Sequence, residues 1–255
     1  MGNYLKILSM GGAISKRKKR SKFAKIFLRG VSPQFEFDSL YLVKIINLFI
    51  KNNNNSSYLN KKPKAINIYD IGCGPCNYFF SNTYKGVKLN YTGIDINYTF
   101  KDHIEKLGGS IIKANLENKL SMIESNSANI IICSHVIEHI KNTESFISEM
   151  YRILSPEGLI FIRTPDIEKV KFEFYDDYTH VRPYTPNSLK NCLLSNNFEV
   201  IYSKSITPLK SVSEIIIKNL PIKIERILLY FLGFLSLFIF RKRREVELLA
   251  TKNFE

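Results

Sequence analysis

The sequence lacks the features that mark secreted and membrane-spanning proteins. Its four cysteines are few for a disulfide scaffold, and one of them, Cys192, lies far from the others. No signal-peptide pattern opens the sequence. The apolar run from Ile227 to Phe240 has fourteen residues, whereas a membrane-spanning helix needs about 20. We therefore expect a cytoplasmic protein without structural disulfides.

Acidic residues are missing from the first 30 positions, which hold nine Lys and Arg. Residues 31–203 carry eighteen charges of each sign, and residues 204–255 carry ten basic against five acidic side chains. The net charge of +14 therefore lies at the two ends. A nucleic-acid enzyme more often spreads its positive charge around its cleft, so nucleic acid is not an expected partner. The ends suit either a solvated tail or peripheral contact with an anionic membrane at its inner face.

Periodicity predicts alternating strands and helices. Strand-like runs lie at residues 65–71, 91–94, 110–113, 129–133, 158–163, 198–203 and 245–253. Apolar residues at helical spacing indicate helices at residues 37–52, 77–81, 98–107, 143–154 and 186–195. This alternation with short turns predicts a doubly wound α/β fold around a parallel sheet. An irregular, aromatic-rich insertion is expected at residues 167–184.

Two segments stand outside this alternation. Residues 1–30 read as a basic N-terminal extension, and residues 31–255 as one domain with an apolar insertion near 206–244 before the last strand. The apolar run in that insertion is closed by RKRR, so it could lie in a membrane plane, cover the substrate pocket or form a core helix. If the last strand joins the same sheet, a single membrane crossing is excluded.

The glycine-rich turn after the first strand stops short of a dinucleotide signature. Gly72 and Gly74 lie where doubly wound folds bind ligands, and Asp95 closes the next strand 23 residues after Gly72. A carboxylate there can bind both hydroxyls of a ribose. Pro75, however, has no N–H to offer a pyrophosphate, and Asn77 replaces the glycine of a dinucleotide site. The turn therefore favours an adenosine-containing cofactor without phosphate.

These motifs resemble those of the class I methyltransferases that use S-adenosylmethionine, in the group named methyltransferase type 11, 12 and 23. The resemblance covers residues 65–203 through five segments in order: DIGCGPCNYF, GIDIN, KANLEN, IIICSHVIEHI and MYRILSPEGLIFIRTPD. It implies a Rossmann-like, seven-stranded, mainly parallel sheet with an antiparallel last strand, and S-adenosylmethionine as cofactor. The departures are Cys76 at the third glycine position, Asn129 in place of an acid, and Glu157 within the Pro-Gly-Gly turn.

The resemblance also implies cofactor contacts. Gly72 and Gly74 would pass under the methionine portion, Asp95 would bind the ribose diol, and Asn115 with Leu116 would lie beside the adenine. Two residues just past the fourth strand would face the transferring methyl. The other positions expected at the cofactor, including that pair, are Asp70, Cys73, Ile96, Ser134 and His135.

Methyl transfer to a hydroxyl needs a base, and histidine is the natural base near neutral pH. His103 falls on a predicted helix away from the strand ends, and His139 is expected to stabilise the start of a helix. His180 lies in the insertion where this fold usually builds its substrate lid, and His135 follows the fourth strand. We expect His180 or His135 to be the base.

Metal and redox chemistry are not expected. Residues 176–182 hold two acids, a histidine and an arginine, but no convincing ligand spacing, which favours a polar lid with internal salt bridges. Cys73 and Cys76 form one C-x-x-C pair, and no second pair completes a zinc site.

The sequence CSHVIEH after the fourth strand lacks the Asn/Asp-Pro-Pro-aromatic motif by which enzymes that methylate nucleobase nitrogens resemble one another. The sequence instead predicts O-methylation of a small, lipid-linked or glycan-type acceptor. The alternatives are a soluble quinone or secondary-metabolite methyltransferase, a methyltransferase-like binding protein without activity, and an RNA methyltransferase.

Overall fold

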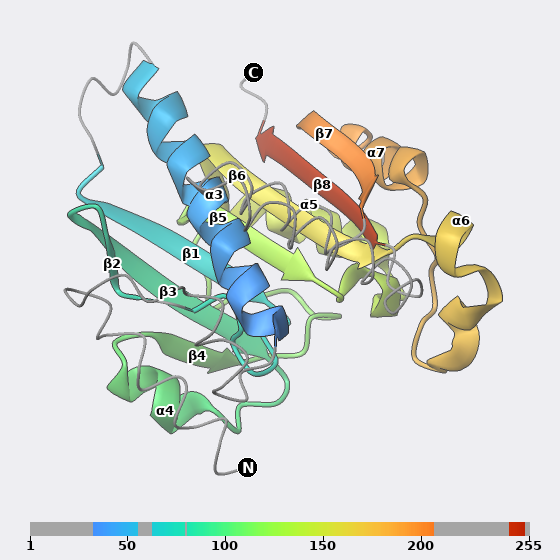
Figure 1. Cartoon of the computed structure of the whole chain (residues 1–255), viewed down its shortest axis with the longest axis horizontal. Helices are drawn as coiled ribbons and strands as arrows, with labels where there is room; N and C mark the ends of the chain where they lie inside the picture. Colours follow the sequence, from blue (N-terminus) through green and yellow to red (C-terminus); the bar gives the residue numbers. More distant parts are fainter. Residues whose placement is uncertain (1–32, 56–62, 80, 207–244, 253–255) are drawn as a thin grey trace, which may run out of the picture.

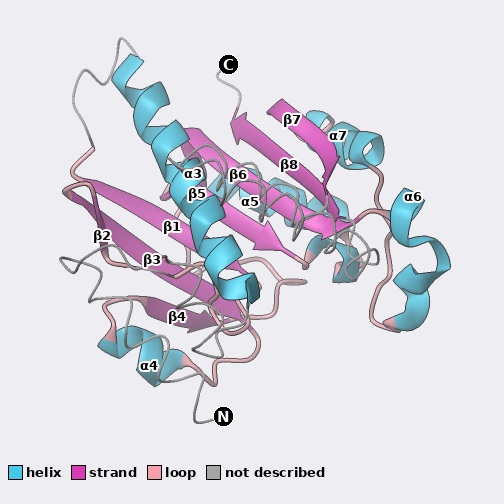
Figure 2. Ribbon diagram, in the orientation of Figure 1, coloured by secondary structure: helices cyan, strands magenta, loops and turns pink. Residues whose placement is uncertain are grey.

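The structure is a computed structural model that describes residues 33–55, 63–79, 81–206 and 245–252. A single twisted sheet forms its centre, with helices on both faces (Figure 1; Figure 2). The basic extension and the apolar run at residues 227–240 lie outside the described residues. Within the described part, no helix is both long and apolar enough to cross a membrane.

The sheet has the strand order β2-β3-β1-β5-β6-β8-β7, and β4 also pairs with β3. The strands are β1 Ala65–Ile71, β2 Thr83–Tyr84, β3 Val87–Asp95, β4 Ser110–Lys113, β5 Ala128–Ser134, β6 Leu154–Pro165, β7 Phe198–Ile206 and β8 Glu245–Lys252. β8 lies antiparallel between β6 and β7, whereas β1, β3, β4, β5 and β6 pair in parallel. The seven expected strands and the antiparallel last strand are confirmed. Strand order reverses beside β1, which opens a ligand crevice at the carboxyl ends of the strands.

Helices cover both faces because the central strands are apolar on both sides. α3 (Pro33–Asn55) and α4 (Lys101–Lys106) pack on one face, and α5 (Thr143–Ile153) and α7 (Pro186–Leu194) pack on the other. In β5, Ile130 and Ile132 point toward the face of α3, while Ile131 and Cys133 point toward that of α5. The core therefore consists of two apolar layers with the sheet between them.

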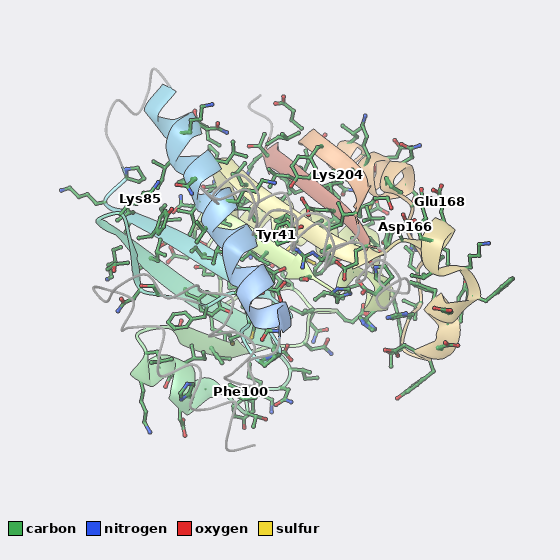
Figure 3. The ribbon with its side chains drawn as sticks, in the orientation of Figure 1. Tyr41, Lys85, Phe100, Asp166, Glu168 and Lys204 are labelled. Atoms are coloured by element: carbon green, nitrogen blue, oxygen red, sulfur yellow. The ribbon has the colours of Figure 1, made fainter. Side chains whose placement is uncertain are left out.

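α3 is fixed across the sheet by an aromatic contact near the carboxyl end of β6. Tyr41 of α3 lies over the middle of the sheet (Figure 3), and its ring stacks on Phe161 at 5.8 Å between centroids. The guanidinium of the buried Arg163 lies 4.4 Å from the centre of the Tyr41 ring. This packing holds the first turns of α3 beside the ligand crevice.

The prediction of a helix at residues 77–81 is wrong. Residues 74–78 form successive turns, in which the N–H of Phe79 donates to Cys76 O at 3.1 Å. Cys76 has a φ of +59°, and this left-handed conformation cannot continue a right-handed helix.

Four further short elements were not predicted. The two-residue strand β2 is too short to give a periodic signal, and Lys85 and Gly86, both with positive φ, turn it back onto β3. The insertion after β6 holds α6 (Ile167–Val170) and a 3-10 turn, η3 (Lys171–Asp176), and Asp166 caps α6 through the N–H of Glu168. A second 3-10 turn, η2 (Ile137–His139), follows β5.

Candidate functional site

The turn after β1 brings the backbone against β3 at a point where only glycine fits. The N–H of Gly72 donates to Ile94 O at 2.7 Å, and Gly72 has a φ of +69°. A Cβ atom at Gly72 would lie 2.2 Å from Val136 Cγ2. A side chain at this position would therefore meet both steric and backbone strain.

Asp95 holds the other half of this turn. Its Oδ2 accepts the N–H of Gly74 at 2.8 Å, and its Oδ1 accepts the N–H of Asn97 at 2.8 Å. Each carboxylate oxygen keeps further lone-pair capacity, which suits the two hydroxyls of a ribose. A Cβ at Gly74 would meet nothing within 4 Å, so the backbone is open to a ligand there. The turn and the acid thus fit an adenosyl cofactor.

The ends of β3 and β4 lie side by side, because Asp95 pairs in register with Lys113. Ile96 is 64% exposed, which leaves an apolar side chain free beside the ribose acid. Asn115 Oδ1 accepts the N–H of Glu117 at 3.0 Å and so fixes the loop after β4, while Leu116 packs on the core. An apolar edge thus lies next to the acid, and the binding of adenine there stays a prediction.

A cavity of about 510 Å³ opens on the other side of the turn. Six of the ten expected cofactor positions line it: Asp70, Gly72, Cys73, Gly74, Ser134 and His135. The other four, at the ends of β3 and β4, lie outside this lining. Two of the lining residues that were not expected are acids: Asp38 comes from α3 and Glu245 from β8. No local pattern in the sequence marks either acid as part of a ligand site, because Asp38 lies within α3 and Glu245 opens β8.

The two cysteines of the turn are packing residues. Cys73 and Cys76 are buried, and a Cβ at Gly93 of β3 would lie 2.6 Å from Cys73 Sγ. All four cysteines of the chain are free thiols. The thiols therefore fill the space between the turn and β3.

Asp70, one residue before the end of β1, lines the cavity and is almost fully buried. The pKa of its carboxyl is raised to about 7, mainly because burial disfavours the charged form. A hydrogen bond from the Tyr91 hydroxyl, at 2.6 Å, lowers this pKa, whereas the nearby carboxylates of Asp38 and Asp95 raise it. A carboxyl with a pKa near 7 exchanges its proton at neutral pH.

His135 is held between two carboxylates. Its backbone is left-handed, with a φ of +55°, and its N–H donates to Arg163 O at 2.8 Å. The ring Nδ1 lies 3.3 Å from Glu138 Oε1, and Nε2 lies 3.2 Å from Glu245 Oε1. Burial opposes the charged ring, but the two carboxylates outweigh it and raise the pKa of His135 to about 10. The imidazole is therefore protonated at neutral pH.

His180 lies in the insertion and does not line the cavity. Its Nδ1 is 2.6 Å from Phe174 O, so Nδ1 carries the hydrogen and Nε2 is the basic nitrogen, 3.9 Å from Asp177 Oδ2. Its ring centre is 4.7 Å from that of His139.

Glu138, His139 and His180 offer possible ligand atoms within 4.8 Å of one another. Thr164 donates to Glu138 at 2.9 Å, and His139 Nδ1 lies 2.9 Å from Thr179 Oγ1. The same hydroxyl of Thr179 donates to Asp177.

The profile of a family described as a methyltransferase domain matches residues 45–203, which is more than half of the chain. The chain belongs to this methyltransferase family. S-adenosylmethionine is its cofactor, and the cofactor turn and Asp95 described above lie within the matched residues.

Curated relatives of this methyltransferase include two ubiquinone biosynthesis O-methyltransferases. The protein of Glaesserella parasuis serovar 5 is 26% identical over 152 residues, which cover 56% of this chain and 61% of the relative. That of Rickettsia akari is 27% identical over 154 residues, covering 58% and 59%. The match thus spans about three-fifths of these relatives.

Solved methyltransferase structures share the fold. A SAM-dependent methyltransferase from Archaeoglobus fulgidus aligns with a TM-score of 0.54 at 20% identity, covering 92% of this chain and all of the other. Phosphoethanolamine N-methyltransferase 2 of Haemonchus contortus, solved with S-adenosylhomocysteine, aligns at 0.52 and 16% identity, covering 84% and 52%. Likeness at this level of identity shows the fold alone.

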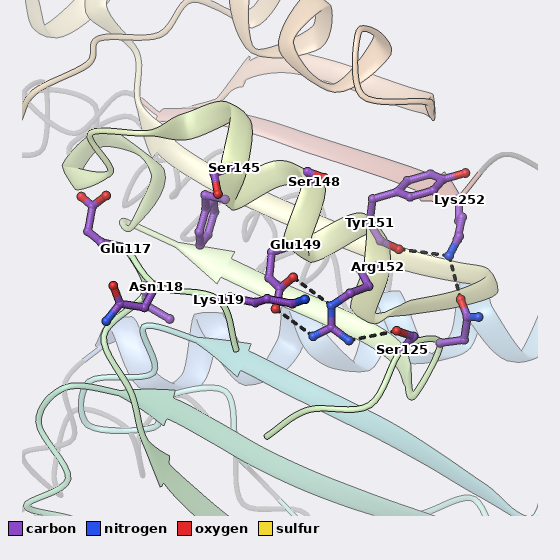
Figure 4. A pocket seen from close by; sticks show the side chains of 13 residues that line it. Glu117, Asn118, Lys119, Ser125, Ser145, Ser148, Glu149, Tyr151, Arg152 and Lys252 are labelled. Atoms are coloured by element: carbon purple, nitrogen blue, oxygen red, sulfur yellow. Dashed lines mark hydrogen bonds and ion pairs between the residues drawn. The ribbon is translucent and has the colours of Figure 1, made fainter. Parts of the chain in front are cut away.

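The methyltransferase has a second cavity, of about 600 Å³, along α5 (Figure 4). Several of its polar groups are paired within the protein: Arg152 bonds to Glu149 at 2.8 Å and to Ser125 at 3.0 Å, and Lys252 donates to Asn126 at 2.7 Å. Arg152 and Lys252 of this groove are therefore already engaged within the protein.

Proposed function

We propose that this methyltransferase transfers the methyl group of S-adenosylmethionine to a hydroxyl oxygen on the ring of a small, quinone-precursor acceptor. The observation that carries this proposal is the likeness, at 26% to 28% identity, to ubiquinone biosynthesis O-methyltransferases. The sequence alone favoured a lipid-linked or glycan-type acceptor, which becomes the rival acceptor class.

The surroundings of the cavity support a flat apolar acceptor. Beyond the cofactor turn, the wall includes Tyr78, Pro165 and Val170. The insertion that provides Val170 also exposes Phe172 by 87% and Tyr178 by 94%. Aromatic side chains offer large, flat contact surfaces, which suit an aromatic ring better than a glycan with many hydroxyls.

Bound S-adenosylmethionine supplies a methyl group that its sulfonium has already activated. The work left to the chain is to orient the acceptor hydroxyl and to take its proton. His135 is unsuited to that role, since two carboxylates keep it protonated. His180 keeps a basic Nε2, and Asp177 beside it would stabilise the ring once protonated. We therefore assign the base to His180, on the insertion whose Val170 lines the cavity.

Transfer of labelled methyl from S-adenosylmethionine to 4-methylcatechol tests this proposal. We expect one O-methylated product, and loss of both cofactor binding and transfer in Asp95→Ala. His180→Gln should lower kcat by about 100-fold, the ordinary contribution of a general base, while cofactor affinity measured by calorimetry is unchanged. His103→Gln, on α4, is the matched control and should keep full activity.

The rival functions give different results. Cofactor binding without transfer to any hydroxyl would identify a binding protein. Methyl transfer to glycan or lipid-linked hydroxyls in a cell extract, with no transfer to catechols, would reject the quinone-type acceptor. Transfer of the labelled methyl group to RNA in that extract would identify an RNA methyltransferase.

A further inference from the structure

The 3-10 turn η2 and the insertion after β6 bring three possible metal ligands together. The side chains are those of Glu138, His139 and His180, whose ligand atoms lie within 4.8 Å of one another. The backbone fixes this approach, because the carbonyl oxygen of Glu138 accepts the N–H of Val181 at 2.8 Å and that of Arg182 at 3.1 Å. The segment that carries His180 is therefore tied to η2 directly beside the three side chains.

Hydrogen bonds leave the same nitrogen open on both imidazole rings. His180 Nδ1 lies 2.6 Å from Phe174 O, and His139 Nδ1 lies 3.2 Å from Thr179 O. A carbonyl oxygen can only accept, so each Nδ1 carries the hydrogen and each Nε2 of the neutral ring keeps its lone pair. Histidines that bind metals usually donate their other ring N–H in this way. Both rings thus have the tautomer that a metal ion requires.

Glu138 supplies a buried oxygen to the same cluster. Its side chain is fully buried, and its Oε2 accepts the hydroxyl of Thr164 at 2.9 Å. Its Oε1 forms an ion pair with His135 Nδ1 at 3.3 Å, but within the described part of the chain it accepts no hydrogen bond. A carboxylate oxygen has two lone pairs, so Oε1 can face His135 and a metal ion together. Coordination would satisfy a buried oxygen that otherwise lacks a hydrogen bond.

The ligand types select the kind of ion. Two imidazoles and one carboxylate are typical of open zinc sites, whereas magnesium and calcium prefer oxygen ligands. Ligand atoms about 2.1 Å from a tetrahedral zinc ion lie about 3.4 Å apart. The three atoms would therefore move together by at most about 1.4 Å, which small rotations of the two half-buried rings can supply. Water, or Asp177 Oδ2 at 3.9 Å from His180 Nε2, would complete the coordination.

We propose that Glu138, His139 and His180 bind a divalent transition-metal ion such as zinc, and that the bound ion inhibits methyl transfer. His180 Nε2 is the nitrogen assigned to take the acceptor's proton, and a nitrogen bound to a metal has no lone pair left for it. None of the three residues belongs to the described lining of the cavity, so the ion is separate from the positions expected to hold the cofactor. The metal site rests on geometry alone, whereas its inhibitory effect rests on the proposed function.

Metal binding is tested first and without turnover. The full chain is cleared of metal with EDTA and titrated with Co²⁺, whose visible absorption reports its coordination, and Zn²⁺ is then added to displace it. All four histidines of the chain lie in the described residues, so each can be replaced in turn.

His139→Asn is the decisive variant, because it keeps an N–H donor near the position of Nδ1 and removes Nε2. It should weaken Co²⁺ binding by about 100-fold or more, since loss of an outer partner of a ligand already costs about 10- to 100-fold. His180→Asn makes the same change on the other element and should have the same effect on binding. His103→Asn, on α4, is the matched control and should bind Co²⁺ like the wild type.

Inhibition is tested by methyl transfer to 4-methylcatechol with and without Zn²⁺. Saturating zinc should lower kcat of the wild type by about 100-fold, the contribution of a general base, and leave cofactor affinity unchanged. His139→Asn should keep its activity at the same zinc concentration. Because catechols themselves bind zinc, the difference between wild type and His139→Asn in the same mixture is the quantity that decides.

Several results would overturn the inference. If Co²⁺ gives no spectrum with the wild type, or binds equally well to His139→Asn and His180→Asn, there is no such site; His180→Asn alone decides this if His139→Asn does not fold. Zinc that binds at the site and leaves kcat unchanged or raises it would reject the inhibition. If no acceptor is methylated at all, the proposed function fails and the inhibition with it, whereas the Co²⁺ titration still decides whether the metal site exists.

Discussion

Replacing Asp70 by asparagine should stabilise the free protein at alkaline pH and remove part of its pH dependence. Burial holds the pKa of Asp70 at about 7, against 3.8 for a free carboxyl. The folded state therefore keeps a proton that the unfolded chain releases above pH 3.8. The stability linked to this proton is full below pH 3.8, falls as the pH rises toward 7, and changes no further above it. Asparagine can still accept the Tyr91 hydrogen bond, and it carries no charge to bury.

The magnitude follows from the same pKa. Between pH 5 and pH 7 the wild type should lose about 3 kcal/mol relative to Asp70→Asn, at about 1.4 kcal/mol for each pH unit. Urea unfolding at pH 5 and pH 8 measures this difference. Asp102→Asn, an exposed acid of α4, is the control and should show no such growth. If the free energies of unfolding of Asp70→Asn and the wild type differ by the same amount from pH 5 to pH 8, the raised pKa of Asp70 is refuted.

Three further measurements address the turn, the clamped histidine and the undescribed apolar run. Gly72→Ala should destabilise the protein by several kcal/mol in thermal unfolding, because its Cβ would meet Val136. Gly74→Ala, where φ is also positive but the space is open, should cost about 1 kcal/mol. The ring of His135 should titrate by NMR near pH 10, and a midpoint near 6.5 would contradict the two-carboxylate clamp. From the basic ends of the sequence we also propose peripheral membrane contact: flotation with anionic liposomes should weaken in high salt and on removal of residues 227–240, and unchanged partitioning would argue against it.

The parts of the fold that were predictable are those with a strong local signal. β1 and β4 match the expected residues exactly, because apolar runs between turn residues define a buried strand. The prediction of a helix at residues 77–81 failed because Tyr78 and Phe79 belong to a turn and are nevertheless buried. Over so few residues, the spacing of apolar side chains cannot distinguish a turn from a short helix. β2 was missed because two residues carry no period.

The site divides in the same way. The glycines and Asp95 were predictable since their spacing is fixed by consecutive strands and turns of one chain segment. Asp38 and Glu245 were not, because these two residues lie more than 200 positions apart in the sequence and reach the cavity from different elements. The protonated state of His135 was also hidden, as it depends on Glu245, which no local pattern brings beside it.

The position of β8 between β6 and β7 has a consequence for how the enzyme is made. Until residues 245–252 have left the ribosome, β6 is an open sheet edge, with backbone groups free to pair with other chains. β7 also has no strand to pair with until then. The cofactor turn and Asp95 can form earlier in synthesis, but the wall containing Glu245 cannot. A nascent chain would thus complete its cofactor turn before the last wall of the cavity, and stalled or truncated products would be sensitive to aggregation at that edge.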